Sequence, residues 1–244
     1  MLQGKKGFYH SIQTIGTLDG PGLRYVLFLQ GCPFRCLFCH NPDTWTGAGK
    51  KIDVDYLVDD ILKYKVFYET SNGGFTVSGG EPLLQTEFLT ELFVKLKAAG
   101  VHTTVDTCGY VDLTEKLDRL VEVTDLFMLD IKHLNPEVHL KFTGKPNDKV
   151  LNFLNYLNQK KKKIWIRQVL VPGISMDDAY IEKLINFLKN YEIEKVELLP
   201  YHDMAKEKYE ELKIDYPLKD TPVPPKAEVL KIRQKFLDNG FNAF

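Results

Sequence analysis

Three of the four cysteines in this 244-residue chain lie in one short stretch, at Cys32, Cys36 and Cys39. Thiolates this close together suit a metal ion or an iron–sulfur cluster better than a disulfide framework. A zinc site with His40 as the fourth ligand is the simpler interpretation, but structural zinc sites usually take their ligands from two separated pairs. A cluster held by three cysteines leaves one iron open to a substrate or cofactor. The fourth cysteine, Cys108, could add a ligand, although a small buried residue is the simpler interpretation.

Composition and length indicate an ordinary globular protein. The chain is 44% hydrophobic and 27% charged, with a net charge of −1, so nothing favours nucleic acid or an anionic membrane as a partner. No signal peptide follows the polar start at residues 1–7, and no apolar run of about 18 residues could span a membrane. We therefore expect a cytoplasmic protein whose cysteines are reduced.

Short apolar runs alternate with amphipathic stretches along the chain, which predicts strands alternating with helices. Strands are expected at 24–30, 75–78, 101–107, 126–131, 164–171 and 195–199. Helices are expected around 57–62 and at 88–96, 113–121, 136–142, 149–160, 181–188 and 226–239. This alternation indicates an α/β fold with a parallel sheet. Residues 8–23 are interpreted as an entry segment that ends in a turn, and residues 47–51 as a connector.

Polar side chains occur at the end of nearly every predicted strand. In chain order these are the segment from Cys32 to Cys39, called the cysteine loop, then Gly79-Gly80-Glu81-Pro82, Asp106-Thr107, Asp130-Ile131-Lys132, Arg167, and Tyr201-His202. Because sites in parallel α/β sheets form at the carboxyl ends of the strands, one shared site is expected.

Each of these groups also has a structural interpretation. The glycines before Glu81 permit either a tight turn or close approach of a ligand. Glu81 could then accept a hydrogen bond from an ammonium group of that ligand. Asp106 and Asp130 could each cap the following helix. Arg167 could form a structural salt bridge, and His202 could be a surface residue. The segment from Asp19 to Gly22 could be a simple turn.

The cysteine spacing, with an aromatic residue at Phe38 before Cys39, resembles the signature of the radical S-adenosylmethionine (SAM) enzymes. The whole chain resembles one branch of them, the glycyl-radical-enzyme activases. The segments that carry this closer resemblance are 19–24, 30–32, 39–41, 78–82, 106–107, 128–132, 165–167 and 199–202.

The resemblance implies an incomplete (β/α)6 TIM-like barrel, formed as a single domain over residues 1–244 with its core at about 19–240. It implies that Cys32, Cys36 and Cys39 hold one [4Fe–4S] cluster, whose open iron binds the amino and carboxylate groups of SAM. Reductive cleavage would give methionine and a 5′-deoxyadenosyl radical, which takes a hydrogen atom from a glycine of a partner enzyme. Since cofactors carry this chemistry, no side chain is expected to act as an acid or base.

The same resemblance implies roles for individual residues. The expected SAM contacts are Phe38, Cys39, His40, Gly79, Gly80, Glu81, Asp106, Asp130, Ile131, Lys132, Arg167 and His202. A monovalent cation site is expected at Asp106, Thr107, Met128 and Asp130. Asp19 is expected to position the partner's glycine loop.

The implied partner is pyruvate formate-lyase, with reduced flavodoxin or ferredoxin as electron donor and a monomeric activase. Many related activases insert a ferredoxin-like module with further cysteines before the first helix. Here only Asn41 to Asp53 lies between the cysteine loop and that helix, without a cysteine. This favours pyruvate formate-lyase, while an activase of a different glycyl radical enzyme stays an alternative. A non-catalytic zinc-binding protein is a more remote one.

Overall fold

The structure of the chain is a computed structural model, which describes residues 5–46 and 49–244. Residues 1–4 of the polar start and residues 47–48 of the expected connector lie outside this description. The chain forms two compact units: Met1–Pro33 with Thr44–Met128, called unit 1, and Phe34–Asp43 with Leu129–Phe244, called unit 2. Among the described residues, no helix is both long enough and apolar enough to cross a membrane.

Unit 1 is built on strands in the order β3-β1-β2-β4-β5-β6. Their bounds are β1 (Lys6–Gly16), β2 (Arg24–Leu29), β3 (Lys50–Asp53), β4 (Gly74–Gly79), β5 (His102–Thr107) and β6 (Leu126–Asp130). Strand β6 belongs to unit 1 only as far as Met128. Strands β2, β4 and β5 run parallel. Apart from half-buried Phe28, β2 is buried along its whole length, as its continuous apolar sequence predicts.

Strands β1 and β3 correct the sequence interpretation, which treated residues 8–23 as an entry segment and 47–51 as a connector. Both pair antiparallel, β1 with β2 and β3 with β1. Most of β1 is half-buried or exposed, so its sequence lacks the apolar run by which the other strands were predicted. Its strand conformation follows from pairing with its neighbours rather than from burial.

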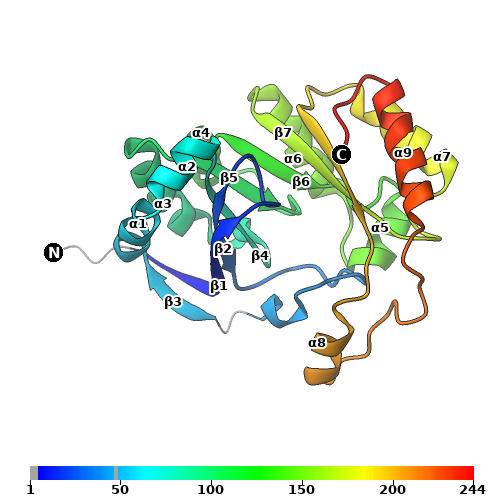
Figure 1. The fold of residues 1–244 in the computed structure, drawn as a ribbon, viewed down its shortest axis with the longest axis horizontal. Coiled ribbons are helices and arrows are strands. Elements are labelled where there is room, and N and C mark those ends of the chain that lie inside the picture. The colour runs from blue at the N-terminus through cyan, green and yellow to red at the C-terminus, as the bar shows by residue number, and fades with distance from the viewer. Residues whose placement is uncertain (1–4, 47–48) are drawn as a thin grey trace. The chain divides into compact units, whose positions relative to one another are not determined.

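The helices of unit 1 gather beside its strands (Figure 1). They are α1 (Val54–Leu62), α2 (Lys65–Ser71), α3 (Thr86–Ala98) and α4 (Glu115–Val123), with the short 3-10 helix η2 (Pro82–Gln85) before α3. The apolar stripe of α3 is buried, as its helical spacing predicts. Helix α2 was not predicted, and no side chain caps its start.

Unit 2 holds the end of β6 together with β7 (Lys163–Leu170) and β8 (Lys195–Pro200), in the order β6-β7-β8. Its helices are α5 (Pro136–Thr143), α6 (Asp148–Gln159), α7 (Asp178–Leu188), α8 (Lys206–Glu211) and α9 (Lys226–Asp238), and the 3-10 helix η1 (Pro42–Thr44) begins here. After β8 the chain passes through α8 before it reaches α9, which lies beside α7 (Figure 1).

The six predicted strands are all present, so the expected α/β fold with a mostly parallel sheet is confirmed. Their ends also fall where the motifs require. Asp106 and Thr107 end β5, and Asp130 ends β6. Arg167 lies on β7, and Tyr201 directly follows β8.

Candidate functional site

Cys32 follows the end of β2 in unit 1. The preceding Gly31 donates its backbone N–H to Thr44 O at 2.7 Å, and Cys32 N donates to Trp45 O at 3.3 Å. The Cys32 side chain is half-buried. The start of the cysteine loop is therefore fixed by backbone hydrogen bonds before the remaining cysteines are reached.

The other two cysteines of the loop lie in unit 2 and share a turn. Cys39 N donates to Cys36 O at 3.0 Å. On either side of Cys36, Arg35 N donates to Thr143 O at 2.7 Å and Leu37 N donates to Phe142 O at 3.0 Å. Cys36 thus sits between two backbone amides that are held by the last turn of α5.

The thiols of this loop suit an iron–sulfur cluster. Cys32, Cys36 and Cys39 are all reduced thiols and half-buried, so each can ligate iron as a thiolate. Cys108 differs, because burial above all, and then the charge of Glu81, raise the pKa of its thiol well above the usual range. Within residues 5–46 and 49–244, no three Cys, His, Asp or Glu side chains are assembled into a metal-holding group. The assignment of the ligands therefore rests on their spacing and thiol chemistry.

The two glycines before Glu81 are explained by the protein's own backbone. Gly79 adopts φ +113°, and a Cβ there would lie 2.3 Å from Leu29 N. A Cβ on Gly80 would lie 2.1 Å from Gly31 O. Such contacts are impossible for larger residues, so the turn after β4 can pack on the end of β2 only with glycine. Close approach of a ligand is not needed to account for them.

Glu81 is completely buried and holds the same turn to the end of β5. One carboxylate oxygen accepts from Leu83 N at 2.9 Å and from Thr107 Oγ1 at 2.6 Å, and the other accepts from Cys108 N at 2.8 Å. Burial raises the pKa of Glu81, and the hydrogen bonds from Cys108 and Thr107 oppose that rise. An additional contact of Glu81 to an ammonium group stays a prediction.

Asp106 lies beside this turn, since Ser78 Oγ donates to Asp106 Oδ2 at 2.7 Å. Its expected cation-site neighbours in unit 1, Thr107 and Met128, are both buried. The capping alternative for Asp106 is wrong, because Thr114 caps α4. In unit 2, Asn135 rather than Asp130 caps α5.

Three of the expected SAM contacts come together in unit 2. Lys132 Nζ lies 2.8 Å from Asp130 Oδ2 and 4.9 Å from the centre of the Phe38 ring. Lys132 is buried, and the intervening Ile131 donates its backbone N–H to Arg167 O at 3.0 Å. A buried cation held by one carboxylate and one aromatic face is suited to bind an anionic group.

His40 and His202 form a second group in unit 2. Their rings stack with centroids 3.8 Å apart, and His40 Nε2 donates to His202 O at 3.2 Å. Burial, and then the neighbouring His202, lower the pKa of His40, which favours a neutral ring. His202 Nδ1 is buried and makes no hydrogen bond within the described chain. This orphaned nitrogen fits a contact to a bound molecule better than a surface loop position.

Arg167 forms the ion pair that the structural alternative predicted. Its Nε donates to Glu197 Oε2 at 2.9 Å, and Lys195 lies 3.0 Å from the other oxygen of Glu197. Arg167 and Glu197 are direct partners in the parallel register of β7 and β8. A contact between Arg167 and SAM stays a prediction.

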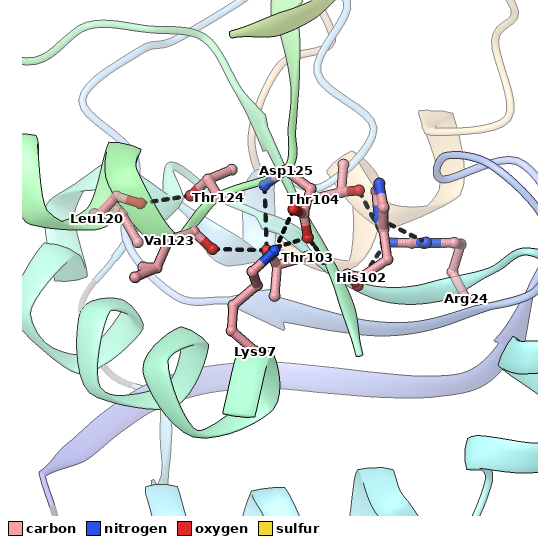
Figure 2. Close-up of polar contacts among 9 residues, drawn as sticks. All are labelled: Arg24, Lys97, His102, Thr103, Thr104, Leu120, Val123, Thr124 and Asp125. Atoms are coloured by element: carbon pink, nitrogen blue, oxygen red, sulfur yellow. Dashed lines mark hydrogen bonds and ion pairs between the residues drawn. The ribbon is translucent and has the colours of Figure 1, made fainter. Parts of the chain in front are cut away.

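The turn that carries Asp19 is held at the opposite end of the unit 1 strands from Glu81. Thr76 Oγ1 donates to Asp19 O at 2.6 Å, and the fully buried Arg24 donates from Nε to Thr76 Oγ1 at 2.8 Å. Arg24 also donates to Thr104 Oγ1 at 2.8 Å (Figure 2). These contacts lie where β2, β4 and β5 begin, whereas Glu81 follows the end of β4. Asp19 and Glu81 are therefore separated by the length of a strand.

Sequence reasoning missed two buried residues near the cysteine loop. The ring of His139 on α5 packs against Phe34, with centroids 5.6 Å apart. Tyr209 on α8 is buried, and after burial itself the charges of Cys39 and Cys36 raise its pKa. A polar residue on the apolar face of the predicted helix 136–142 was a usable signal for His139. No signal pointed to Tyr209, because the pattern of elements loosens after Pro200.

Comparison with known proteins identifies the family of the chain. A family profile of the radical SAM superfamily matches residues 26–188. The chain is 48% identical to a pyruvate formate-lyase-activating enzyme of Listeria monocytogenes, over 96% of this chain and 97% of that protein. A pyruvate formate-lyase-activating enzyme of Staphylococcus epidermidis is also 48% identical, with the same coverage. A crystal structure of a domain of a pyruvate-formate lyase-activating enzyme from Bacteroides vulgatus superposes with a TM-score of 0.60 at 27% identity, covering 70% of this chain and 98% of that one.

Proposed function

Because this chain belongs to the radical SAM superfamily, we propose that it activates pyruvate formate-lyase by generating a glycyl radical on that enzyme. The resemblance drawn from the sequence motifs is confirmed by the family profile and by relatives at 48% identity over nearly the whole chain. The observation that carries the proposal is this long match together with three reduced cysteines at the C-x3-C-x2-C spacing.

When bound, the cluster supplies the electron that cleaves SAM to methionine and a 5′-deoxyadenosyl radical, which takes a hydrogen atom from a glycine of the partner. The chain's own residues bind and orient. Cys32, Cys36 and Cys39 hold one [4Fe–4S] cluster as thiolates. Lys132 binds the anionic end of SAM, with Asp130 and the Phe38 ring fixing its position. No side chain needs to transfer a proton.

Several further residues of the chain contribute to SAM binding. The orphaned Nδ1 of His202 and its stacking on His40 support a contact of this pair with SAM. The Gly79-Gly80-Glu81 turn contributes backbone groups to the SAM site. Arg167 contacts SAM while it stays paired with Glu197. The other expected contacts also bind SAM. A monovalent cation is held by Asp106, Thr107, Met128 and Asp130.

The partners and setting complete the proposal. A reduced flavodoxin or ferredoxin delivers the electron, and the activase works as a cytoplasmic monomer with residues 1–244 as a single domain. Asp19 contacts the partner's glycine loop. Since Asp19 lies a strand length from the Glu81 turn, that loop has to extend along the strands to reach both.

The deciding experiment is anaerobic incubation of the reconstituted protein with reductant, SAM and pyruvate formate-lyase. We expect the electron paramagnetic resonance (EPR) signal of a glycyl radical on pyruvate formate-lyase, and no signal with the Cys36→Ser variant. A different glycyl radical enzyme, added in a parallel reaction, tests the nearer alternative. If SAM is cleaved but only that second enzyme acquires a radical, the partner assignment is wrong. A colourless protein that binds zinc and no iron would instead support the remote alternative.

A further inference from the structure

The last turn of α5 serves as a receptor for the cysteine loop. The final carbonyls of a helix have no partner within the helix, and here Phe142 O and Thr143 O accept from Leu37 N and Arg35 N. The Phe38 ring packs on Phe142 with centroids 4.9 Å apart. Residues on both sides of Cys36 are therefore held by one helix end.

This helix end is itself closed by His139. Gly144 ends α5 with φ +78°, and its N–H donates to Leu140 O at 2.8 Å. His139 Nδ1 donates to Lys145 O at 2.7 Å, across that turn. Thr143 Oγ1 donates to His139 O at 2.9 Å. The imidazole, together with the Thr143 hydroxyl that accepts from Lys145 N at 3.3 Å, thus ties the residue after the glycine back onto the helix.

Only one nitrogen of His139 takes part. The side chain is 1% exposed, and its Nε2 makes no hydrogen bond among the residues that the structure describes. Because a carbonyl oxygen only accepts, Nδ1 must carry the proton in the bond to Lys145. The bond to Lys145 O therefore requires a hydrogen-bond donor at the δ position of the side chain of residue 139.

We propose that His139 is a positioning residue for the cluster-binding loop: its Nδ1–H fixes the end of α5, whose carbonyls hold the amides on either side of Cys36. This inference rests on the proposed function for the identity of the cluster. The hydrogen bonds through which His139 acts are made by the protein alone, so its effect on the loop is also expected when no cluster is bound. His139 touches neither the reacting atoms nor the cysteines and acts through the backbone.

The first test is amide hydrogen exchange in the cluster-free protein. In the wild type, the hydrogen bonds of Arg35 N and Leu37 N protect these amides. We expect His139→Leu, which keeps an apolar side chain but has no donor, to raise their exchange rates about tenfold. His139→Asn places an amide donor at the δ position and should restore most of the protection. His139→Gln carries the same amide one carbon further out and should not.

The second test is release of iron to a chelator from the anaerobically reconstituted protein. We expect His139→Leu to lose iron about tenfold faster than the wild type, and His139→Asn to lose it at nearly the wild-type rate. The control is Leu157→Ala, which removes a fully buried side chain from α6 in the same unit. It should lower the melting temperature without a matching gain in iron release.

The outcomes separate the two claims. A wild-type protein that binds no cluster would contradict the proposed function, and the exchange experiment would still decide the role of His139. Equal exchange at Arg35 and Leu37 in the wild type and His139→Leu would overturn that role alone. So would iron release that simply follows melting temperature across His139→Leu, His139→Gln and Leu157→Ala.

Discussion

Glu81 accepts a hydrogen bond from Thr107 Oγ1 over 2.6 Å, although 26 residues separate the two in the sequence. Together with the bond from Cys108 N, it joins the turn after β4 to the end of β5. The carboxylate is fully buried, and Leu83 N, Thr107 Oγ1 and Cys108 N all donate to it. This makes Glu81 a structural group whatever else it contacts.

Replacing Glu81 with glutamine should change how stability depends on pH. Burial raises the pKa of Glu81 in the folded protein, so the unfolded chain loses this proton first as pH rises. The contribution of Glu81 to the free energy of unfolding is therefore greatest below its ordinary pKa of about 4.3 and falls as pH rises toward the folded value. Glu81→Gln does not titrate and should lack this fall. Urea unfolding of the cluster-free wild type and variant, from about pH 4 to about pH 8, measures this dependence. Parallel plots of the free energy of unfolding against pH would contradict the prediction.

Replacing Arg24 should destabilise unit 1 strongly. Arg24 is fully buried and donates to Thr76 Oγ1, Thr104 Oγ1 and Phe75 O. Arg24→Met leaves these acceptors without their donor, which should lower the free energy of unfolding by about 3 kcal/mol or more. Arg24→Lys should have a smaller effect. The matched control is Arg119→Met, at an exposed position, which should change stability by less than about 0.5 kcal/mol. Urea unfolding of the three variants is the measurement.

Serine variants should separate the ligand cysteines from Cys108. Cys32→Ser, Cys36→Ser and Cys39→Ser should each lose most of the iron and sulfide bound after anaerobic reconstitution, because a hydroxyl is a poor substitute for a thiolate. Cys108→Ser should keep both, since burial raises the pKa of the Cys108 thiol and so disfavours the thiolate that would ligate iron. Iron loss in Cys108→Ser at an unchanged melting temperature would identify Cys108 as a fourth ligand.

Removing the Lys132 charge should weaken SAM binding. A hydrogen bond between charged groups contributes about 1.5–3 kcal/mol, so Lys132→Met should raise the dissociation constant of SAM about 10- to 100-fold. Anaerobic calorimetry on the cluster-loaded protein is the measurement. Lys206→Met removes a half-buried lysine that pairs with Asp203 at 2.7 Å, and it should bind SAM like the wild type. Equal affinity in both variants would remove Lys132 from the site.

Asp19→Asn should separate partner activation from SAM cleavage. The Asp19 turn lies at the start of β2 and is held through its backbone by Thr76, and asparagine has nearly the size and shape of aspartate, so the substitution should keep the turn. We expect the SAM cleavage rate to stay the same while the yield of glycyl radical on the partner falls about tenfold. Both quantities come from one reaction, by chromatography of methionine and by EPR. An unchanged radical yield would show that Asp19 has no part in substrate positioning.

The strands and their ends could be predicted from sequence because burial leaves a local pattern. The runs at β2 and β6 are nearly continuous in apolar residues, and each motif follows its run directly. Strand β1 escaped detection because its half-buried residues carry no such pattern. It was defined only by its pairing with β2 and β3.

The contacts of the expected site residues could not be predicted from the sequence. The ion pair of Arg167 with Glu197 depends on the register between β7 and β8, which spacing along one chain does not specify. The glycines at 79 and 80 looked like a ligand cradle, yet the atoms they avoid belong to Leu29 and Gly31. In both cases the deciding neighbour comes from another strand.

The hold of α5 on the cysteine loop sets an order of events during biosynthesis. The ribosome releases Cys32, Cys36 and Cys39 long before it reaches Phe142 and Thr143, whose carbonyls hold the loop. Contacts between such distant segments form late, because the long loop between them must close first. A nascent chain that stops short of Gly144 therefore presents Cys36 and Cys39 on a segment that lacks its α5 support, although Cys32 N can already donate to Trp45 O. The loop that is to bind the cluster is therefore complete only after the second half of the chain has left the ribosome.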